Sequence, residues 1–291
     1  MLDRLVAGSD AYAYAPLFVD LDERPTACDT TPTVAVTSSR TGTTLTAPTA
    51  VAVSSGQPGA YRTVLTEADH TGDLDLLTLT WSGLVDTYTR TLTTTVEVAG
   101  GAYVATSELV EARAIVPDGI DLYTRARVWR TAFERLAERA RGVAFVPRFA
   151  IETHRPGRTV AVHEARPREV LAVWVDDVAQ TAADFALSPA GILTNADGSA
   201  YTPSGVPVIA YSHGHDAPPA AVVEACRVWV RGRMLADGSD AQRNVLSFTN
   251  LASGEVYRYG TSDWSAGRFT GIAEVDDLLA SVPDERMPAI R

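Results

Sequence analysis

Two histidines separated by one residue are the clearest candidates for chemistry in this sequence. His213 and His215 flank a glycine, and Asp216 follows them. Imidazole and carboxylate groups at this spacing can ligate a metal, and a metal-bound water would indicate a hydrolase. The sequence offers no obvious third anchor, and the Gly and Asp equally fit a turn that leads into a helix. We therefore expect no metal and no cofactor in this chain.

Other reactive patterns are incomplete. Residues 195–199 resemble the start of a calcium loop, but Val206 stands where the bidentate Glu is needed. The acidic groups at 20–23 and 73–75 could form acid/base pairs, although acids beside surface strands are more common. Cys226 lies on an apolar helical stripe, and neither a nucleophile elbow nor a glycine-rich phosphate loop occurs. These patterns favour a protein that is not an enzyme.

The composition narrows the possible partners. The chain has 291 residues and a formal net charge of −11, and all 25 basic side chains are Arg. The absence of Lys is typical of a GC-rich coding genome. Tight non-specific binding of nucleic acid needs an excess of cations at the contact surface, so the acidic balance disfavours it. Cys28 and Cys226 suggest neither a disulfide scaffold nor a zinc site.

The first third of the chain has the pattern of β structure. Residues 1–29 combine aromatic and acidic side chains and predict an N-terminal arm. From 30 to 105, short alternating runs are separated by turns, as where Leu77, Leu79 and Trp81 alternate with threonines. Six or seven such strands predict an immunoglobulin-like β-sandwich.

The remainder predicts helices with a small sheet. Apolar residues recur every three or four positions over 121–141, and Gly142 follows, which predicts an amphipathic helix. A second such helix is expected after Pro219, with β-rich stretches between the two. Residues 106–236 would form this core, and 237–291 a C-terminal arm with a short terminal helix. The predicted fold class is α+β and multidomain.

Three stretches carry a resemblance to a known family. These are FERLAERARGVAFVPR at 133–148, YSHGHDAPP at 211–219 and FTGIAEVD at 269–276. The region from about 115 to 280 resembles the head-to-tail connector (adaptor) proteins of tailed bacteriophages that infect actinobacteria. The β-sandwich at 30–105 departs from simpler connectors, and we interpret it as an outward decoration.

The resemblance implies a structural virion protein. Twelve copies would form a ring under the portal protein and meet stopper or tail proteins on the other side. Genomic DNA would pass through the ring without sequence-specific binding. No membrane would be a partner of the protein. The protein would be assembled in the host cytoplasm and reside in the neck of the virion.

Two groups of residues are candidates for contacts in such an assembly. The Arg-rich face of the first helix would pack in the ring or face DNA, although Glu134 and Glu138 also fit a solvated face. Its members are Arg125, Arg127, Arg130, Arg135 and Arg139. Aromatic residues of the C-terminal arm would contact a partner, namely Tyr257, Tyr259, Trp264 and Phe269.

Three alternatives remain open at this point. The first is a stopper or tail-completion protein of the same junction, which neighbouring gene order rather than sequence usually distinguishes from an adaptor. The β-sandwich could instead recognise carbohydrate or a host surface, which would require aromatic side chains at its loop end. A hydrolase that uses residues 213–216 would contain bound metal.

Overall fold

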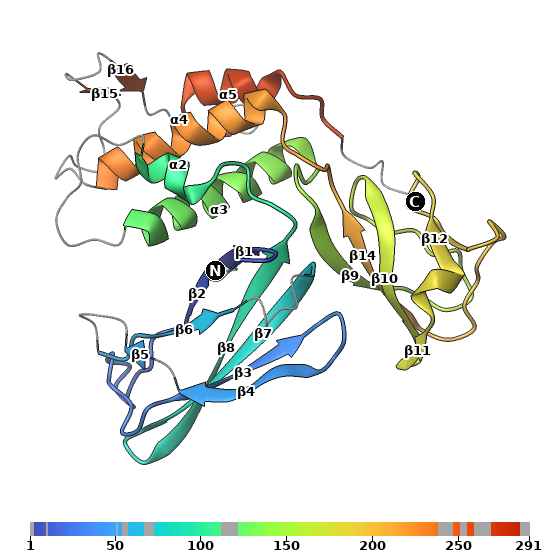
Figure 1. Cartoon of the computed structure of the whole chain (residues 1–291), viewed down its shortest axis with the longest axis horizontal. Coiled ribbons are helices and arrows are strands. Elements are labelled where there is room, and N and C mark those ends of the chain that lie inside the picture. Colours follow the sequence, from blue (N-terminus) through green and yellow to red (C-terminus); the bar gives the residue numbers. More distant parts are fainter. Residues whose placement is uncertain are drawn as a thin grey trace. The chain divides into compact units, whose positions relative to one another are not determined.

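The chain has an α+β fold, in agreement with the sequence-based prediction, and most of its elements are strands (Figure 1). The computed structural model describes residues 3–9, 11–50, 52–53, 58–66, 73–111, 122–237, 247–250, 255–258 and 269–285. The chain divides into two compact units. We call residues 1–101 with 147–213 the strand-rich unit, and residues 102–146 with 214–291 the helical unit.

A five-stranded sheet forms the first part of the strand-rich unit, in the order β1-β8-β7-β3-β4. Its strands are β1 (Asp3–Val6), β3 (Thr33–Ser38), β4 (Thr44–Ala50), β7 (Asp75–Val85) and β8 (Tyr88–Ala99). Every second residue of β7 is buried, so Leu77, Leu79 and Trp81 enter one core, as their alternation predicts. The Trp81 indole donates a hydrogen bond to Thr94 Oγ1 at 2.8 Å, which satisfies its only polar group.

A three-stranded sheet contributes to the same core, in the order β2-β6-β5. Its strands are β2 (Ala11–Tyr14), β5 (Ala52–Val53) and β6 (Tyr61–Leu65). The expected arm at 1–29 is therefore corrected. β1 pairs in parallel with β8, β2 pairs with β6, and Phe18 is fully buried against Tyr61. Phe18, one of the aromatic residues that suggested an arm, instead lies in the core.

A four-stranded sheet completes the strand-rich unit, in the order β11-β10-β14-β9. Its strands are β9 (Arg148–Thr153), β10 (Pro167–Val175), β11 (Val178–Gln180) and β14 (Pro207–His213). The short helix η1 (Ala182–Asp184) and the hairpin of β12 (Phe185–Leu187) and β13 (Leu193–Asn195) lie beside it in sequence. This sheet belongs with the N-terminal strands rather than with the helices, so the expected boundaries at 106 and 236 differ from the observed units.

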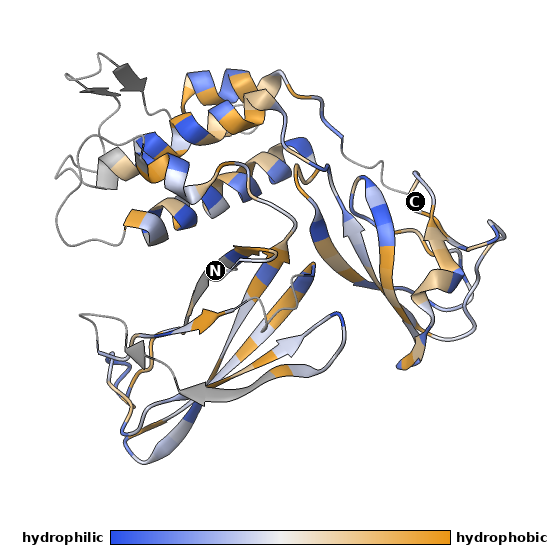
Figure 2. Cartoon of the chain, viewed as in Figure 1, coloured by the Kyte–Doolittle hydropathy of each residue, from blue (hydrophilic) through white to orange (hydrophobic). Residues whose placement is uncertain are grey.

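The helical unit contains α2 (Thr106–Glu111), α3 (Leu122–Arg141), α4 (Ala220–Asp237) and α5 (Ala273–Ala280). A pair of strands, β15 (Ser247–Asn250) and β16 (Glu255–Arg258), is also described. Apolar and polar residues interleave along the helices (Figure 2), as a one-sided core requires. Phe133 of α3 packs between the rings of Tyr103 and Trp229. Gly142 has φ of 69° and ends α3 where predicted.

Candidate functional site

Part of the charged face of α3 lies inside the helical unit. Arg130 is only 5% exposed, and its Nη1 donates to Val104 O at 3.3 Å and Thr106 Oγ1 at 2.8 Å. Its Nε lies 3.5 Å from Glu134 Oε1, which accepts the backbone N–H of Tyr103 at 3.1 Å. The expectation that Arg130 faces DNA or a neighbouring copy is therefore corrected. The pair instead fixes the segment before α2 to α3.

The other predicted arginines of α3 lie nearer the surface. Arg139 is exposed, whereas Arg125, Arg127 and Arg135 are half-buried. These four remain candidates for a contact surface.

The aromatic candidates of the C-terminal segment are only partly described. Phe269 is half-buried, and the guanidinium of Arg141 lies 5.7 Å from its ring centre. Tyr257 pairs with Phe248 in the strand register, but its side chain lies outside the described residues. Tyr259 and Trp264 lie wholly outside them.

Residues 269–276 form a buried polar cap at the start of α5. The Oδ1 atom of Asp276 accepts hydrogen bonds from the Thr270 backbone N–H at 2.8 Å and its hydroxyl at 2.9 Å. Val275 and Leu279 of α5 are fully buried. The polar residues of this stretch thus set the start of α5, while its apolar residues hold the helix in the core.

The two histidines that suggested a metal site face different carboxylates. His213 Nδ1 lies 3.9 Å from Glu164 Oε2, and His215 Nε2 lies 3.3 Å from Glu285 Oε1. Among the residues that the structure describes, no group of three or more His, Cys, Asp or Glu is arranged to hold a metal ion. Gly214 between them has φ of 98°, and a Cβ there would lie 2.6 Å from the carbonyl oxygen of Val146. The segment is a bent connection between β14 and α4.

Two histidines and a tyrosine surround the carboxylate of Glu152 on β9, and the sequence did not predict this cluster. Glu152 accepts hydrogen bonds from His163 Nδ1 at 2.6 Å, from the His163 backbone N–H and from the Tyr211 hydroxyl. His154 Nε2 lies 3.3 Å away, and the two imidazole rings stack at 5.9 Å. The cluster clamps the segment around His163 onto the sheet.

The electrostatics of the cluster follow from these contacts. Desolvation opposes ionisation of Glu152, but the hydrogen bonds from His154, Tyr211 and His163 together lower its pKa from 4.5 to about 2. Burial, followed by the neighbouring Glu152 carboxylate, raises the pKa of Tyr211. Glu152 therefore remains ionised at neutral pH, and Tyr211 remains a hydrogen-bond donor.

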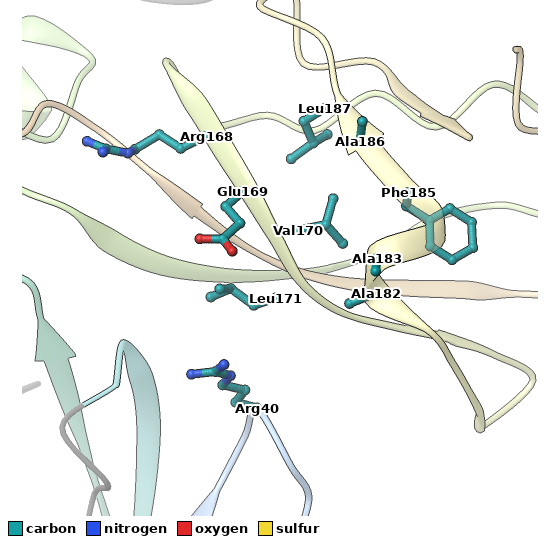
Figure 3. A pocket seen from close by; sticks show the side chains of 10 residues that line it. All are labelled: Arg40, Arg168, Glu169, Val170, Leu171, Ala182, Ala183, Phe185, Ala186 and Leu187. Atoms are coloured by element: carbon teal, nitrogen blue, oxygen red, sulfur yellow. The ribbon is translucent and has the colours of Figure 1, made fainter. Parts of the chain in front are cut away.

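A cavity of about 420 Å³ opens within the strand-rich unit (Figure 3). Val170, Leu187 and the ring of Phe185 belong to its apolar lining, while Arg168 and Glu169 bring opposite charges to it. Arg40 also lines the cavity and pairs with Asp73 at 2.9 Å. The charges of the lining therefore favour neither an anionic nor a cationic ligand.

Comparisons with known proteins assign no family. No family model matches the chain, and no curated protein matches it. In the described part of the chain, none of the helices combines the length and apolarity needed to cross a membrane.

Proposed function

We propose that this chain is a structural virion protein, a head-to-tail adaptor that forms a ring beneath the portal and lets the genome pass. One observation supports this above the others: the three stretches that resemble connectors meet at the C-terminal end of α3. His215 N–H donates to Ala144 O at 2.9 Å, and the ring of Phe269 lies against Arg141. Residues far apart in the sequence thus contact one another at this end of the helix.

The same end of α3 also receives the last described segment of the chain. The backbone N–H of Glu285 donates to Arg141 O at 2.9 Å, and its carboxylate lies beside His215. The stretches that define the resemblance therefore maintain the helical unit. This role is compatible with a structural protein and involves no reaction.

The two sheets formed by the N-terminal part of the strand-rich unit supply the outward decoration in this proposal. The five-stranded and three-stranded sheets share one hydrophobic core, which supports an immunoglobulin-like sandwich within a multidomain adaptor. The excess of acidic residues in the strand-rich unit disfavours attraction to DNA, so the passing genome would not adhere to it.

Co-expression with the portal protein of the same phage tests the proposal. We expect the two proteins to co-purify, and negative-stain images to show the chain as a ring on one end of the portal. A stopper would bind only through an intervening protein and would not co-purify with portal alone. A chain that stays monomeric and does not bind portal would contradict the proposal.

A further inference from the structure

An arginine stacked on two tryptophans marks one side of the α3–α4 pair. The guanidinium of Arg233 lies 5.0 Å from the ring centre of Trp229 and 5.8 Å from that of Trp129. The two indoles meet edge to face at 5.7 Å. Arg233 and Trp129 are half-buried and reach the surface, whereas Trp229 is only 4% exposed. We call these three residues the Trp–Arg cluster.

Several hydrogen-bond donors in and beside this cluster have no acceptor within the described part of the chain. Neither Arg233 nor the nearby Arg231 forms an ion pair with any described residue, and the Nε of each is buried without an acceptor. The indole N–H of Trp229 is likewise buried without one. A partner would reach these arginines through their accessible parts, since Arg231 and Arg233 are only half-buried, and Trp and Arg dominate the energetics of protein interfaces. The cluster thus has the character of a binding surface for an acidic partner.

A complementary feature occurs in the strand-rich unit, at the turn formed by residues 20–24. Leu21 at its tip is 68% exposed, the highest value among the exposed large hydrophobic residues described, and Asp22 and Glu23 beside it are also exposed. Asp20 Oδ1 accepts the backbone N–H groups of Asp22 and Arg24, each at 2.9 Å. These bonds hold the turn in one conformation, which reduces the entropy that binding would cost.

We propose that the 20–24 turn of one copy docks onto the Trp–Arg cluster of a second copy. Leu21 would cover the exposed part of the Trp129 indole, and the carboxylates of Asp22 and Glu23 would pair with Arg231 and Arg233. The contact joins two different surfaces, so it can repeat from one copy to the next and close into a ring. The inference deepens the proposed adaptor function and rests on the self-association which that function requires.

The charge distribution favours another copy over DNA as the occupant. The strand-rich unit has 19 acidic and 10 basic side chains, whereas the helical unit has 17 and 15. The helical unit is thus close to neutral, and the opposite charges that would attract one copy to the next are those of Asp22 and Glu23 against Arg231 and Arg233. Phosphate would also pair with arginine, but it offers no apolar group to cover the Trp129 indole.

Mass photometry of the full chain over a concentration series tests the contact. We expect wild-type protein to assemble, and Asp22→Arg and Arg233→Asp each to weaken assembly by about tenfold or more. Arg158→Asp, at an exposed arginine of the strand-rich unit, is the matched control and should assemble normally. Circular dichroism checks folding. The Asp22→Arg variant should fold, because the side chain of Asp22 is exposed and it is the backbone N–H of this residue that bonds within the turn.

Mixing the two charge-reversed variants tests whether the two sites contact each other. Combined in equal amounts, the Asp22→Arg and Arg233→Asp chains should assemble again, because each altered turn then meets an altered cluster and each original turn an original cluster. A monomeric wild type, unchanged assembly of either variant, or a mixture that stays dissociated would overturn the proposal. So would loss of DNA binding by Arg233→Asp with assembly unchanged.

Portal binding separates this inference from the proposed function. Wild-type chains that assemble through this contact but do not bind portal would refute the adaptor function alone. Portal binding by chains whose assembly is unaffected by the Asp22 and Arg233 changes would refute the docking contact alone.

Discussion

Glu97 and Arg148, 51 positions apart in the sequence, form a buried ion pair in the strand-rich unit. Arg148 Nε lies 3.7 Å from Glu97 Oε1, and Arg4 Nε donates to Glu97 Oε2 at 2.7 Å. The three side chains are each at most 8% exposed. One carboxylate thus links β1, β8 and β9, strands from the beginning, middle and end of the first 150 residues.

Replacement of that carboxylate should be costly. We expect Glu97→Gln to lower the free energy of unfolding of the strand-rich unit by about 3–5 kcal/mol, because two buried guanidinium groups lose their shared charge partner. Urea unfolding followed by Trp fluorescence measures the change. Glu169→Gln, at an exposed carboxylate of the same unit, should alter stability by less than about 1 kcal/mol. Equal effects of the two substitutions would show that Glu97 does not link the strands.

The bend at Gly214 should accept no side chain. Its φ of 98° is unfavourable for any other residue, and a Cβ would meet two carbonyl oxygens, those of Val146 at 2.6 Å and Ala144 at 2.8 Å. We expect Gly214→Ala to destabilise the protein by about 2–3 kcal/mol or to prevent soluble expression. Gly198→Ala is the matched control, since Gly198 has φ of 81° with no atom within 4 Å of the added Cβ. The thermal unfolding midpoint should fall much further for Gly214→Ala than for the control.

Local patterns in the sequence predicted those elements whose apolar residues follow the period of a strand or a helix. The alternation around Leu79 predicted β7, and the apolar stripe with Gly142 after it predicted α3. Charge alone could not reveal that Arg130 is buried, because a salt-bridged pair looks the same on a surface or in a core. The pattern near Phe18 likewise gave no sign that distant strands would cover it.

The Glu152 cluster shows why long-range sites were missed. Its carboxylate, imidazole and phenol groups are spread from 152 to 211, and only the antiparallel register of β9 with β14 brings Glu152 near Tyr211. No spacing rule applies to residues so distributed. The histidines at 213 and 215, which have a metal-like spacing, turn instead to separate carboxylates.

The Glu152 cluster should make stability depend on acid pH. The pKa of Glu152 in the folded protein, about 2, lies below the ordinary 4.5. The contribution of this carboxylate to stability is therefore fully present above pH 4.5 and is lost as pH falls towards 2. We expect Glu152→Gln to be less stable than wild type at pH 7 and to approach it at pH 2–3. Urea midpoints measured from pH 7 to 2 test this. A constant difference across that range would show that the carboxylate charge contributes nothing.

The polar cap of α5 should control how firmly the end of the helical unit is held. The Thr270 hydroxyl donates to Asp276 Oδ1 and accepts the backbone N–H of Ile272 at 3.1 Å, all within a buried site. Thr270→Val keeps the shape but removes the acceptor of the Ile272 N–H and one of the two hydrogen bonds to Asp276 Oδ1, at a cost of about 1–3 kcal/mol. Hydrogen exchange should therefore speed up in α5 while that of α3 changes little. Ser281→Ala, at an exposed hydroxyl just after α5, should leave exchange near wild type. Equal acceleration in all helices would show that Thr270 supports the whole unit rather than this cap.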